Sequence, residues 1–212
     1  MTDLNVLYES ILGGKLEPAV AITEEAIVEG LDPQMIINDY MIKAMEEVGA
    51  RFECGKAYVP NLLMSARAMK GSLDLLKPLL QGDISCSKGK VIIGTVQGDL
   101  HDIGKNIVAS MLEGCGFEVI NLGVDVSGEK FVEAIKEHHA DIVCMSALLT
   151  TTMSYMKDVV VAIEAAGLRD KVKIMVGGAP VTQSFATKIG ANGFSENANK
   201  AVQKAKELMD AN

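Results

Sequence analysis

The sequence predicts an α plus α/β fold, in which a four-helix bundle over residues 1–82 and a linker over 83–89 precede a doubly wound parallel sheet over 90–212. Apolar residues keep a helical spacing up to about residue 82, and a polar stretch from Gln81 to Gly89 follows. Beyond it, short apolar runs alternate with amphipathic segments, which is the pattern of a βαβ series. The 212 residues are 49% hydrophobic, so the chain has enough apolar surface for a substantial core.

Glycine and proline residues predict where four N-terminal helices begin and end. Glycine ends helices because it adopts left-handed backbone angles, and proline after an aspartate suits the first helical position. Short connections between consecutive helices favour an antiparallel bundle. The breaks, in chain order, are Gly13-Gly14, Gly30, Asp32-Pro33 and Val59-Pro60.

Four apolar runs predict the strands of the second half. Runs such as Val91-Ile92-Ile93 are apolar on both faces, so we expect parallel strands covered by helices on each side and joined by right-handed crossovers. A weaker strand is expected near Asn192–Phe194, before a last helix that ends at Met209. The four runs are Lys90–Val96, Phe117–Gly123, Asp141–Ala147 and Lys171–Gly178.

Charge and composition exclude several classes of partner. The net charge is −8 and the chain has no run of Lys or Arg, which argues against binding nucleic acid or an anionic membrane. No segment approaches the ~20 apolar residues of a membrane span, and the N-terminus does not read as a signal peptide, so a cytoplasmic protein is expected. The four cysteines, Cys54, Cys86, Cys115 and Cys144, form no C-x-x-C pair and are expected to be reduced thiols.

Ligands of doubly wound sheets bind beyond the carboxyl ends of the strands, where the strand order reverses. The loops to consider are therefore Gln97–Gly104, Ala147–Thr152 and Gly177–Pro180. Gly98 to Lys105 does not have the spacing of a phosphate loop, no G-x-G-x-x-G follows a strand, and no G-x-S-x-G elbow is present. What remains is His101 with Asp99 two residues before it, an arrangement that holds one imidazole nitrogen while the other binds a metal.

Three short motifs follow the first, third and fourth predicted strands: Asp99-x-His101-x-x-Gly104, Ser146-x-Leu148 and Gly177-Gly178. In this order they resemble the signature of base-off, histidine-on cobalamin-binding domains. The helical half, including "VPNLLMSARAM" from Val59 to Met69, is similar to the cap of methionine synthase and of small corrinoid proteins in methyl-transfer systems. The resemblance covers essentially the whole chain and implies a flavodoxin-like or Rossmann-like cobalamin-binding domain.

By this resemblance His101 is the lower axial ligand of cobalt, and Asp99 accepts a hydrogen bond from its other ring nitrogen. The implied cofactor is cobalamin or a related corrinoid, which carries methyl as methylcobalamin and cycles between Co(I) and Co(III). Small residues at the strand ends open a slot for its nucleotide tail. Besides Asp99 and His101, the residues expected to contact the cofactor are Asp102, Ile103, Gly104, Ser146, Leu148, Thr150, Thr152, Gly177, Gly178 and Ala179.

Some of these assignments have a plain structural alternative. Asp102 could instead cap the helix that begins near Gly104. His138 and His139, at the end of a helix, are expected to lie on the surface without a chemical role. Four cap residues are expected over the reactive face of the cofactor, although Met and Leu at helical spacing are equally typical of a bundle core. They are Tyr58, Leu62, Met64 and Met69.

The resemblance implies a methyl carrier and not a complete enzyme. Its implied partners are a substrate-specific methyltransferase, an acceptor methyltransferase and a reductive activase, as in methanogenesis or acetogenesis. The donor would be a methylamine, methanol, a methylthiol, a betaine or an aryl methyl ether, and the acceptor a thiol or a tetrahydrofolate or other pterin. Two alternatives are a subunit of an adenosylcobalamin mutase, which normally lacks the helical cap, and a cobalamin-dependent sensor.

Overall fold

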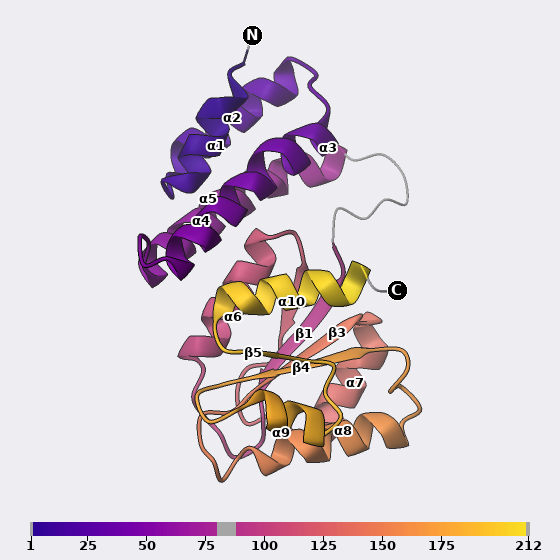
Figure 1. Ribbon diagram of the computed structural model, residues 1–212. Helices are drawn as coiled ribbons and strands as arrows, with labels where there is room; N and C mark the ends of the chain where they lie inside the picture. Colours follow the sequence, from indigo (N-terminus) through magenta and orange to yellow (C-terminus); the bar gives the residue numbers. More distant parts are fainter. Residues whose placement is uncertain (1, 80–87, 211–212) are drawn as a thin grey trace. The chain divides into compact units, whose positions relative to one another are not determined.

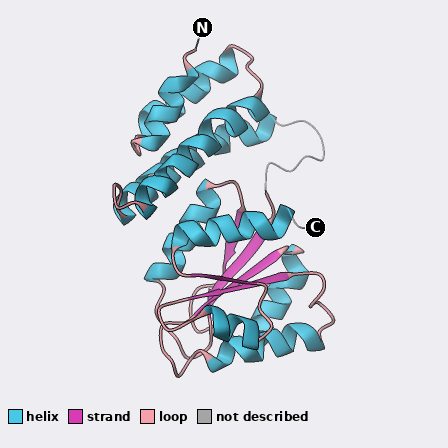
Figure 2. Ribbon diagram, in the orientation of Figure 1, coloured by secondary structure: helices cyan, strands magenta, loops and turns pink. Residues whose placement is uncertain are grey.

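The computed structural model describes residues 2–79 and 88–210 (Figure 1). Its contacts divide the chain into a helical unit and a unit built on a parallel sheet. Figure 2 shows that the strands all belong to the second unit. The predicted linker lies outside the described residues except for Lys88 and Gly89. Of the helices in the described part of the chain, none combines the length and hydropathy of a membrane span.

The helical unit has the four predicted helices within residues 2–79. The third is continuous and passes through a π-helical turn, η1, between α3 and α4. The Asp32 carboxylate accepts a hydrogen bond from Gln34 N at 3.1 Å, so the predicted N-cap forms before Pro33. The helices are α1 (Leu4–Leu12), α2 (Leu16–Val28), α3 (Pro33–Met35), η1 (Ile36–Met41), α4 (Ile42–Glu53), α5 (Val59–Leu76) and the 3₁₀ turn η2 (Lys77–Leu79).

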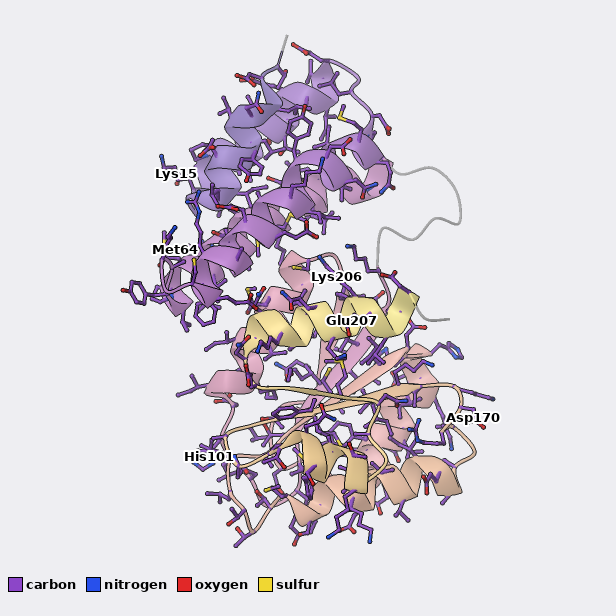
Figure 3. The ribbon with its side chains drawn as sticks, viewed as in Figure 1. Lys15, Met64, His101, Asp170, Lys206 and Glu207 are labelled. Carbon is purple, nitrogen blue, oxygen red and sulfur yellow. The ribbon has the colours of Figure 1, made fainter. Side chains whose placement is uncertain are left out.

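The turn between α1 and α2 requires a glycine at position 14, both for its backbone angles and for lack of space. Gly14 has φ +66°, and a Cβ at this position would lie 2.5 Å from Met64 Cβ. Lys15 and Met64 both lie at this turn (Figure 3). Any larger residue would therefore push α5 away from the first helical hairpin.

The second unit is a five-stranded parallel sheet in the order β2-β1-β3-β4-β5. Helices α6 and α10 lie on one face of the sheet, and α7 and α8 on the other (Figure 1). The strands are β1 (Lys90–Thr95), β2 (Glu118–Asn121), β3 (Ile142–Ser146), β4 (Lys173–Gly177) and β5 (Gly193–Ser195). The helices are α6 (Ile103–Gly114), α7 (Gly128–His138), α8 (Ser154–Ala165), α9 (Gln183–Lys188) and α10 (Ala198–Asp210). The predicted doubly wound fold is confirmed.

The core beneath α7 and α8 depends on a glycine in β1. Phe131 of α7 is fully buried, and a Cβ on Gly94 would lie 2.8 Å from its ring. Truncating a buried phenylalanine to alanine costs about 3–5 kcal/mol, so this contact is a substantial part of the unit's stability. It lies on β1, between β2 and β3, and the last residue of this strand, Thr95, leads directly into the histidine loop.

Cysteine placement agrees with the expected reduced thiols. Cys54, Cys115 and Cys144 take part in no disulfide among the described residues, and Cys86 lies outside them. Complete burial raises the pKa of the Cys144 thiol to about 12, so this group is inert at neutral pH.

Candidate functional site

The loops after β1 and β3 lie on either side of the point where the strand order reverses direction. From β1 the chain proceeds outward to β2, and from β3 it proceeds the other way to β4. The register aligns Thr95 with Ser146 and Ser146 with Gly177, so these residues lie side by side at the carboxyl ends of the strands. The crevice between the two loops is the place where such sheets bind ligands.

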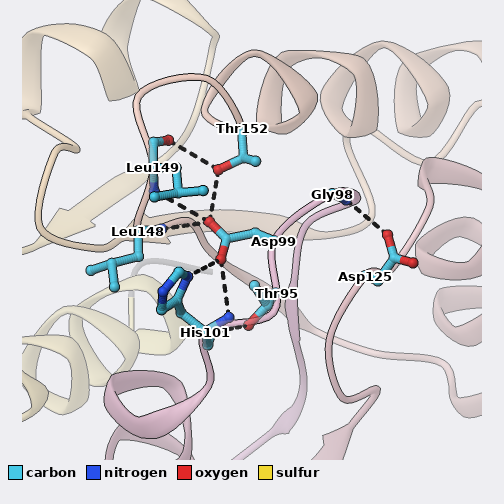
Figure 4. Close-up of polar contacts among 8 residues, drawn as sticks. All are labelled: Thr95, Gly98, Asp99, His101, Asp125, Leu148, Leu149 and Thr152. Atoms are coloured by element: carbon cyan, nitrogen blue, oxygen red, sulfur yellow. Dashed lines mark hydrogen bonds and ion pairs between the residues drawn. The ribbon is translucent and has the colours of Figure 1, made fainter.

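The carboxylate of Asp99 joins the two loops (Figure 4). Its Oδ1 lies 3.0 Å from His101 N and 2.8 Å from His101 Nδ1. Its Oδ2 accepts from Leu148 N at 2.8 Å, from Leu149 N at 3.3 Å and from the Thr152 hydroxyl at 2.7 Å. The Asp99 side chain is fully buried, so nearly all of its capacity to accept is used by protein donors.

These donors keep Asp99 ionised. Burial by itself would raise the pKa of the carboxyl, but hydrogen bonds from Thr152, from the backbone of His101 and Leu148 and from the His101 ring hold its pKa well below the ordinary value. An ionised carboxylate can only accept, so His101 Nδ1 must donate to it. In the neutral imidazole the other ring nitrogen, Nε2, then carries the lone pair.

His101 is held at both backbone and ring yet remains accessible. The buried Thr95 hydroxyl donates to the His101 carbonyl at 2.9 Å. Half of the His101 side chain, 52%, is exposed to solvent. Within residues 2–79 and 88–210, no protein group hydrogen-bonds to Nε2. The site thus presents one oriented ring nitrogen, Nε2, beyond the carboxyl ends of the strands.

Large apolar side chains are exposed in the same two loops and at the starts of α6 and α8. Leu100 is 71% exposed and Ile103 is 79% exposed. Exposed apolar side chains that gather around a polar group mark a binding surface, because a soluble protein otherwise buries them. Three more belong to the second loop and α8: Leu148, Leu149 and Tyr155.

Comparisons with known proteins agree with this geometry. The family model of the B12 binding domain matches residues 89–203, more than half of the 212 residues, and a second B12 binding domain model matches residues 4–77. The dimethylamine corrinoid protein of Methanosarcina barkeri is 47% identical over 207 residues, which are 97% of each chain. The chain belongs to the B12-binding corrinoid protein family. Its cofactor is cobalamin or a related corrinoid.

Two solved structures extend the likeness to both units. A crystal structure of a cobalamin-binding protein from Desulfitobacterium hafniense matches with a TM-score of 0.82 and 32% identity, over 98% of this chain and 99% of that chain. A chain of the methanol:cobalamin methyltransferase complex MtaBC from Methanosarcina barkeri matches with a TM-score of 0.85 and 30% identity, over 99% of this chain and 80% of that chain.

The donor set fits the cobalt of a corrinoid. His101 offers one nitrogen, which suits a metal whose other ligands come from its own ring. In the described part of the chain, no three His, Cys, Asp or Glu side chains gather as a metal-binding group. His101 would hold the cobalt through Nε2, and Asp99 would fix the orientation and tautomer of the imidazole.

The glycines expected to open the tail slot have different surroundings. A Cβ on Gly104 would meet no atom within 4 Å, so this position does border open space. Gly178 has φ +126°, and a Cβ there would lie 1.9 Å from the Ala147 carbonyl oxygen. The missing side chain of Gly178 lets the end of β4 and the loop after β3 approach each other, and its contact with the nucleotide tail stays a prediction.

The remaining predicted contacts lie at the same edge but make few polar contacts there. Asp102 accepts from the Asn106 side chain at 2.9 Å, and its carbonyl accepts from Asn106 N at 2.8 Å, as at the start of a helix. Ser146 is half-buried, while Thr150 and Ala179 are exposed. Their contact with the cofactor stays a prediction.

Sequence reasoning missed the residues that support the histidine loop. Lys105 is almost fully buried and donates to the side-chain oxygens of Asn106 and Asn121, each at 2.7 Å. Burial lowers the pKa of the Lys105 ammonium. Thr95 and Asp125 also contact the loop. No local signal marked Lys105, because its neighbours Gly104 and Asn106 are exposed.

The four cap residues divide into two pairs. Tyr58 is 69% exposed and Met64 is 52% exposed, whereas Leu62 and Met69 are fully buried. Met64 lies against the Gly14 turn of its own unit. A covering role over the corrinoid stays a prediction for all four.

Proposed function

We propose that this corrinoid protein carries a methyl group between two methyltransferases, with dimethylamine as the first donor to consider. The bound corrinoid supplies a cobalt that accepts and releases the methyl group. The observation that carries the proposal is the oriented Nε2 of His101, held through Asp99 in a chain 47% identical to a dimethylamine corrinoid protein over 97% of its length.

Each part of the site has a separate task in this proposal. His101 Nε2 ligates the cobalt, and Asp99 keeps the ring from turning. Leu100, Ile103 and Leu148 present apolar surface to the corrin, and the open space beside Gly104 receives the nucleotide tail. The protein itself therefore binds and orients, while partner enzymes bind the donor and the acceptor.

The division of labour along the chain is part of the proposal. Residues 1–82 serve as a cap, 83–89 as a linker and 90–212 as the cofactor domain, which agrees with separate family matches over 4–77 and 89–203. A substrate-specific methyltransferase loads the protein, a second one unloads it to a thiol or pterin, and a reductive activase restores the reduced cofactor.

The test is a donor panel with the protein reconstituted with a corrinoid and reduced. Purified methyltransferases for dimethylamine, trimethylamine, methylamine and methanol are each supplied with their own substrate, and loss of donor is followed by NMR. We expect demethylation of dimethylamine in amounts equal to the corrinoid protein and much slower reaction with methanol. Equal rates with methanol would overturn the choice of donor, and no reaction with any enzyme would overturn the carrier role.

A further inference from the structure

Asp125 adopts a backbone conformation that L-residues avoid. Its φ is +54°, and within the described ranges only one other non-glycine residue, His139 at +52°, has a positive φ. His139 ends α7, where a left-handed residue commonly terminates a helix. Asp125 lies inside the loop between β2 and α7, so no helix end accounts for its conformation. Such an outlier persists only when its surroundings hold it.

Asp125 makes two hydrogen bonds to the turn that carries Asp99. Its carboxylate Oδ1 accepts from Gly98 N at 2.8 Å (Figure 4), and its own N donates to the Asp99 carbonyl at 3.1 Å. The two bonds run in opposite directions between the same short segments. Together they fix the backbone on both sides of the Gly98–Asp99 peptide.

The turn needs this support because the strand ends before it. Thr95 N donates to the Gly123 carbonyl at 3.0 Å, and Val126 N donates to the Thr95 carbonyl at 3.0 Å, so the loop after β2 is anchored at the end of β1. Beyond Val96, Gly98 is a glycine with φ +78° and has no side chain to restrain it. Beyond the end of the sheet, the Asp125 carboxylate holds the turn by accepting a hydrogen bond from Gly98 N.

The position of this turn decides the geometry of the imidazole. Asp99 Oδ1 lies 2.8 Å from His101 Nδ1, and a hydrogen bond weakens steeply when its partners shift. A turn that moved would carry the carboxylate away from either the ring or the amide of Leu148. Asp125 touches neither the ring nor the second loop in the described contacts, so it acts only through the backbone.

We propose that Asp125 is a positioning residue, which holds the Gly98–Asp99 turn and thereby sets how firmly His101 ligates the corrinoid cobalt. The inference rests on the assignment of His101 as axial ligand in the proposed function. Asp125→Gly removes the carboxylate and adopts the same φ without strain, so the variant should fold. Asp125→Asn keeps an acceptor oxygen and tolerates the left-handed region.

Two measurements test the proposal. In the ligand-free protein, NMR gives the amide exchange rate of Gly98. We expect exchange about tenfold faster in Asp125→Gly, equivalent to about 1.4 kcal/mol, and close to wild type in Asp125→Asn. In the Co(II) form, EPR shows the splitting from an axial nitrogen, which should weaken in the glycine variant and return in the asparagine variant. His139→Gly is the matched control, because it relieves the other left-handed residue, and both readouts should stay unchanged.

The outcomes separate this proposal from the one it rests on. Unchanged EPR splitting in Asp125→Gly would overturn the positioning role, whatever the exchange rate of Gly98. The Asp125→Asn variant retains an acceptor oxygen, so an equal loss of EPR splitting in this variant would also overturn the positioning role. Absence of nitrogen splitting in the wild-type protein would instead overturn the assignment of His101, while the exchange of Gly98 would still report whether Asp125 holds the turn.

Discussion

His101 and His139 are both exposed histidines of the sheet unit, but in the described part of the chain only the ring of His101 is held in place by a hydrogen bond. His101 follows the carboxyl end of β1, and its ring is bonded to the buried carboxylate of Asp99. His139 precedes β3, and its backbone N–H caps α7 at the Ile135 carbonyl. No hydrogen bond of the His139 side chain occurs among the described residues.

The difference shows that accessibility alone does not make a ligand. A free imidazole exchanges tautomers and rotates, so its lone pair points at no fixed place. The Asp99 carboxylate prevents both movements, and it can do so because donors from a second loop keep it charged while buried. The function of His101 therefore resides in partners 49 to 53 residues away from Asp99 in the sequence.

Replacing the two histidines should give the largest contrast. His101→Ala should remove the axial nitrogen and weaken corrinoid binding by at least about 10–100-fold, the range seen when only the hydrogen-bond partners of metal ligands are lost. His139→Asn, which tolerates the left-handed backbone, should bind like wild type. The measurement is a corrinoid titration followed by absorbance; equal affinities of the two variants would contradict the contrast.

Side chains added at Gly104 and at Gly178 should have different effects, on corrinoid binding at the first position and on stability at the second. Gly104→Leu places a side chain in open space on a helix, so stability should hold or rise by about 0.5–1 kcal/mol while corrinoid binding is lost. Gly178→Ala should instead destabilise the fold, because its Cβ meets the Ala147 carbonyl. Urea unfolding and titration of both variants check this. Normal binding by Gly104→Leu would place the tail elsewhere.

Asp99→Asn should lower stability in a pH-dependent way. The folded protein holds the pKa of Asp99 below its unfolded value of about 3.9, so its contribution is complete above that value and declines as the pH falls toward the folded pKa. We expect the variant to be about 1–3 kcal/mol less stable at neutral pH. The deficit should shrink as urea unfolding of the ligand-free protein is repeated below about pH 4. A deficit independent of pH would mean that charge is not what Asp99 contributes.

Thr152→Val should give the smallest effect. It removes the hydroxyl that donates to Asp99 Oδ2 but leaves the Leu148 amide in place. We expect a loss of about 1 kcal/mol in unfolding free energy and slightly weaker axial ligation. A loss as large as that of Asp99→Asn would show that this hydroxyl, and not the group of donors, holds the carboxylate.

The fold and the histidine site could largely be predicted from the sequence because their signals are local. The four strong runs are strands within a few residues of the expected ends, and the break at Asp32-Pro33 forms the predicted cap. The motif around Asp99 and His101 is a single short segment. Local spacing was enough for each of these features.

Other features depend on contacts between distant segments, and the sequence does not display them. The bond from Gly98 to Asp125 spans 27 residues, and neither residue type indicates a partner. Gly178 was assigned to a ligand slot because the sequence does not show whether open space or backbone lies beside a glycine. In the structure the backbone of Ala147 lies there. The π-helical turn at Ile36–Met41 keeps the apolar spacing of an ordinary helix, so its pattern gave no warning.

The central claim, that His101 Nε2 ligates the corrinoid cobalt, is tested most directly by EPR of the Co(II) form made with histidine labelled with the heavy nitrogen isotope. The account predicts that the axial nitrogen splitting changes from a triplet to a doublet in the labelled wild-type protein. It predicts the same change in His139→Asn and no nitrogen splitting from histidine in His101→Ala. A splitting that stays a triplet after labelling would show that the axial nitrogen comes from the cofactor's own base, and it would contradict the account.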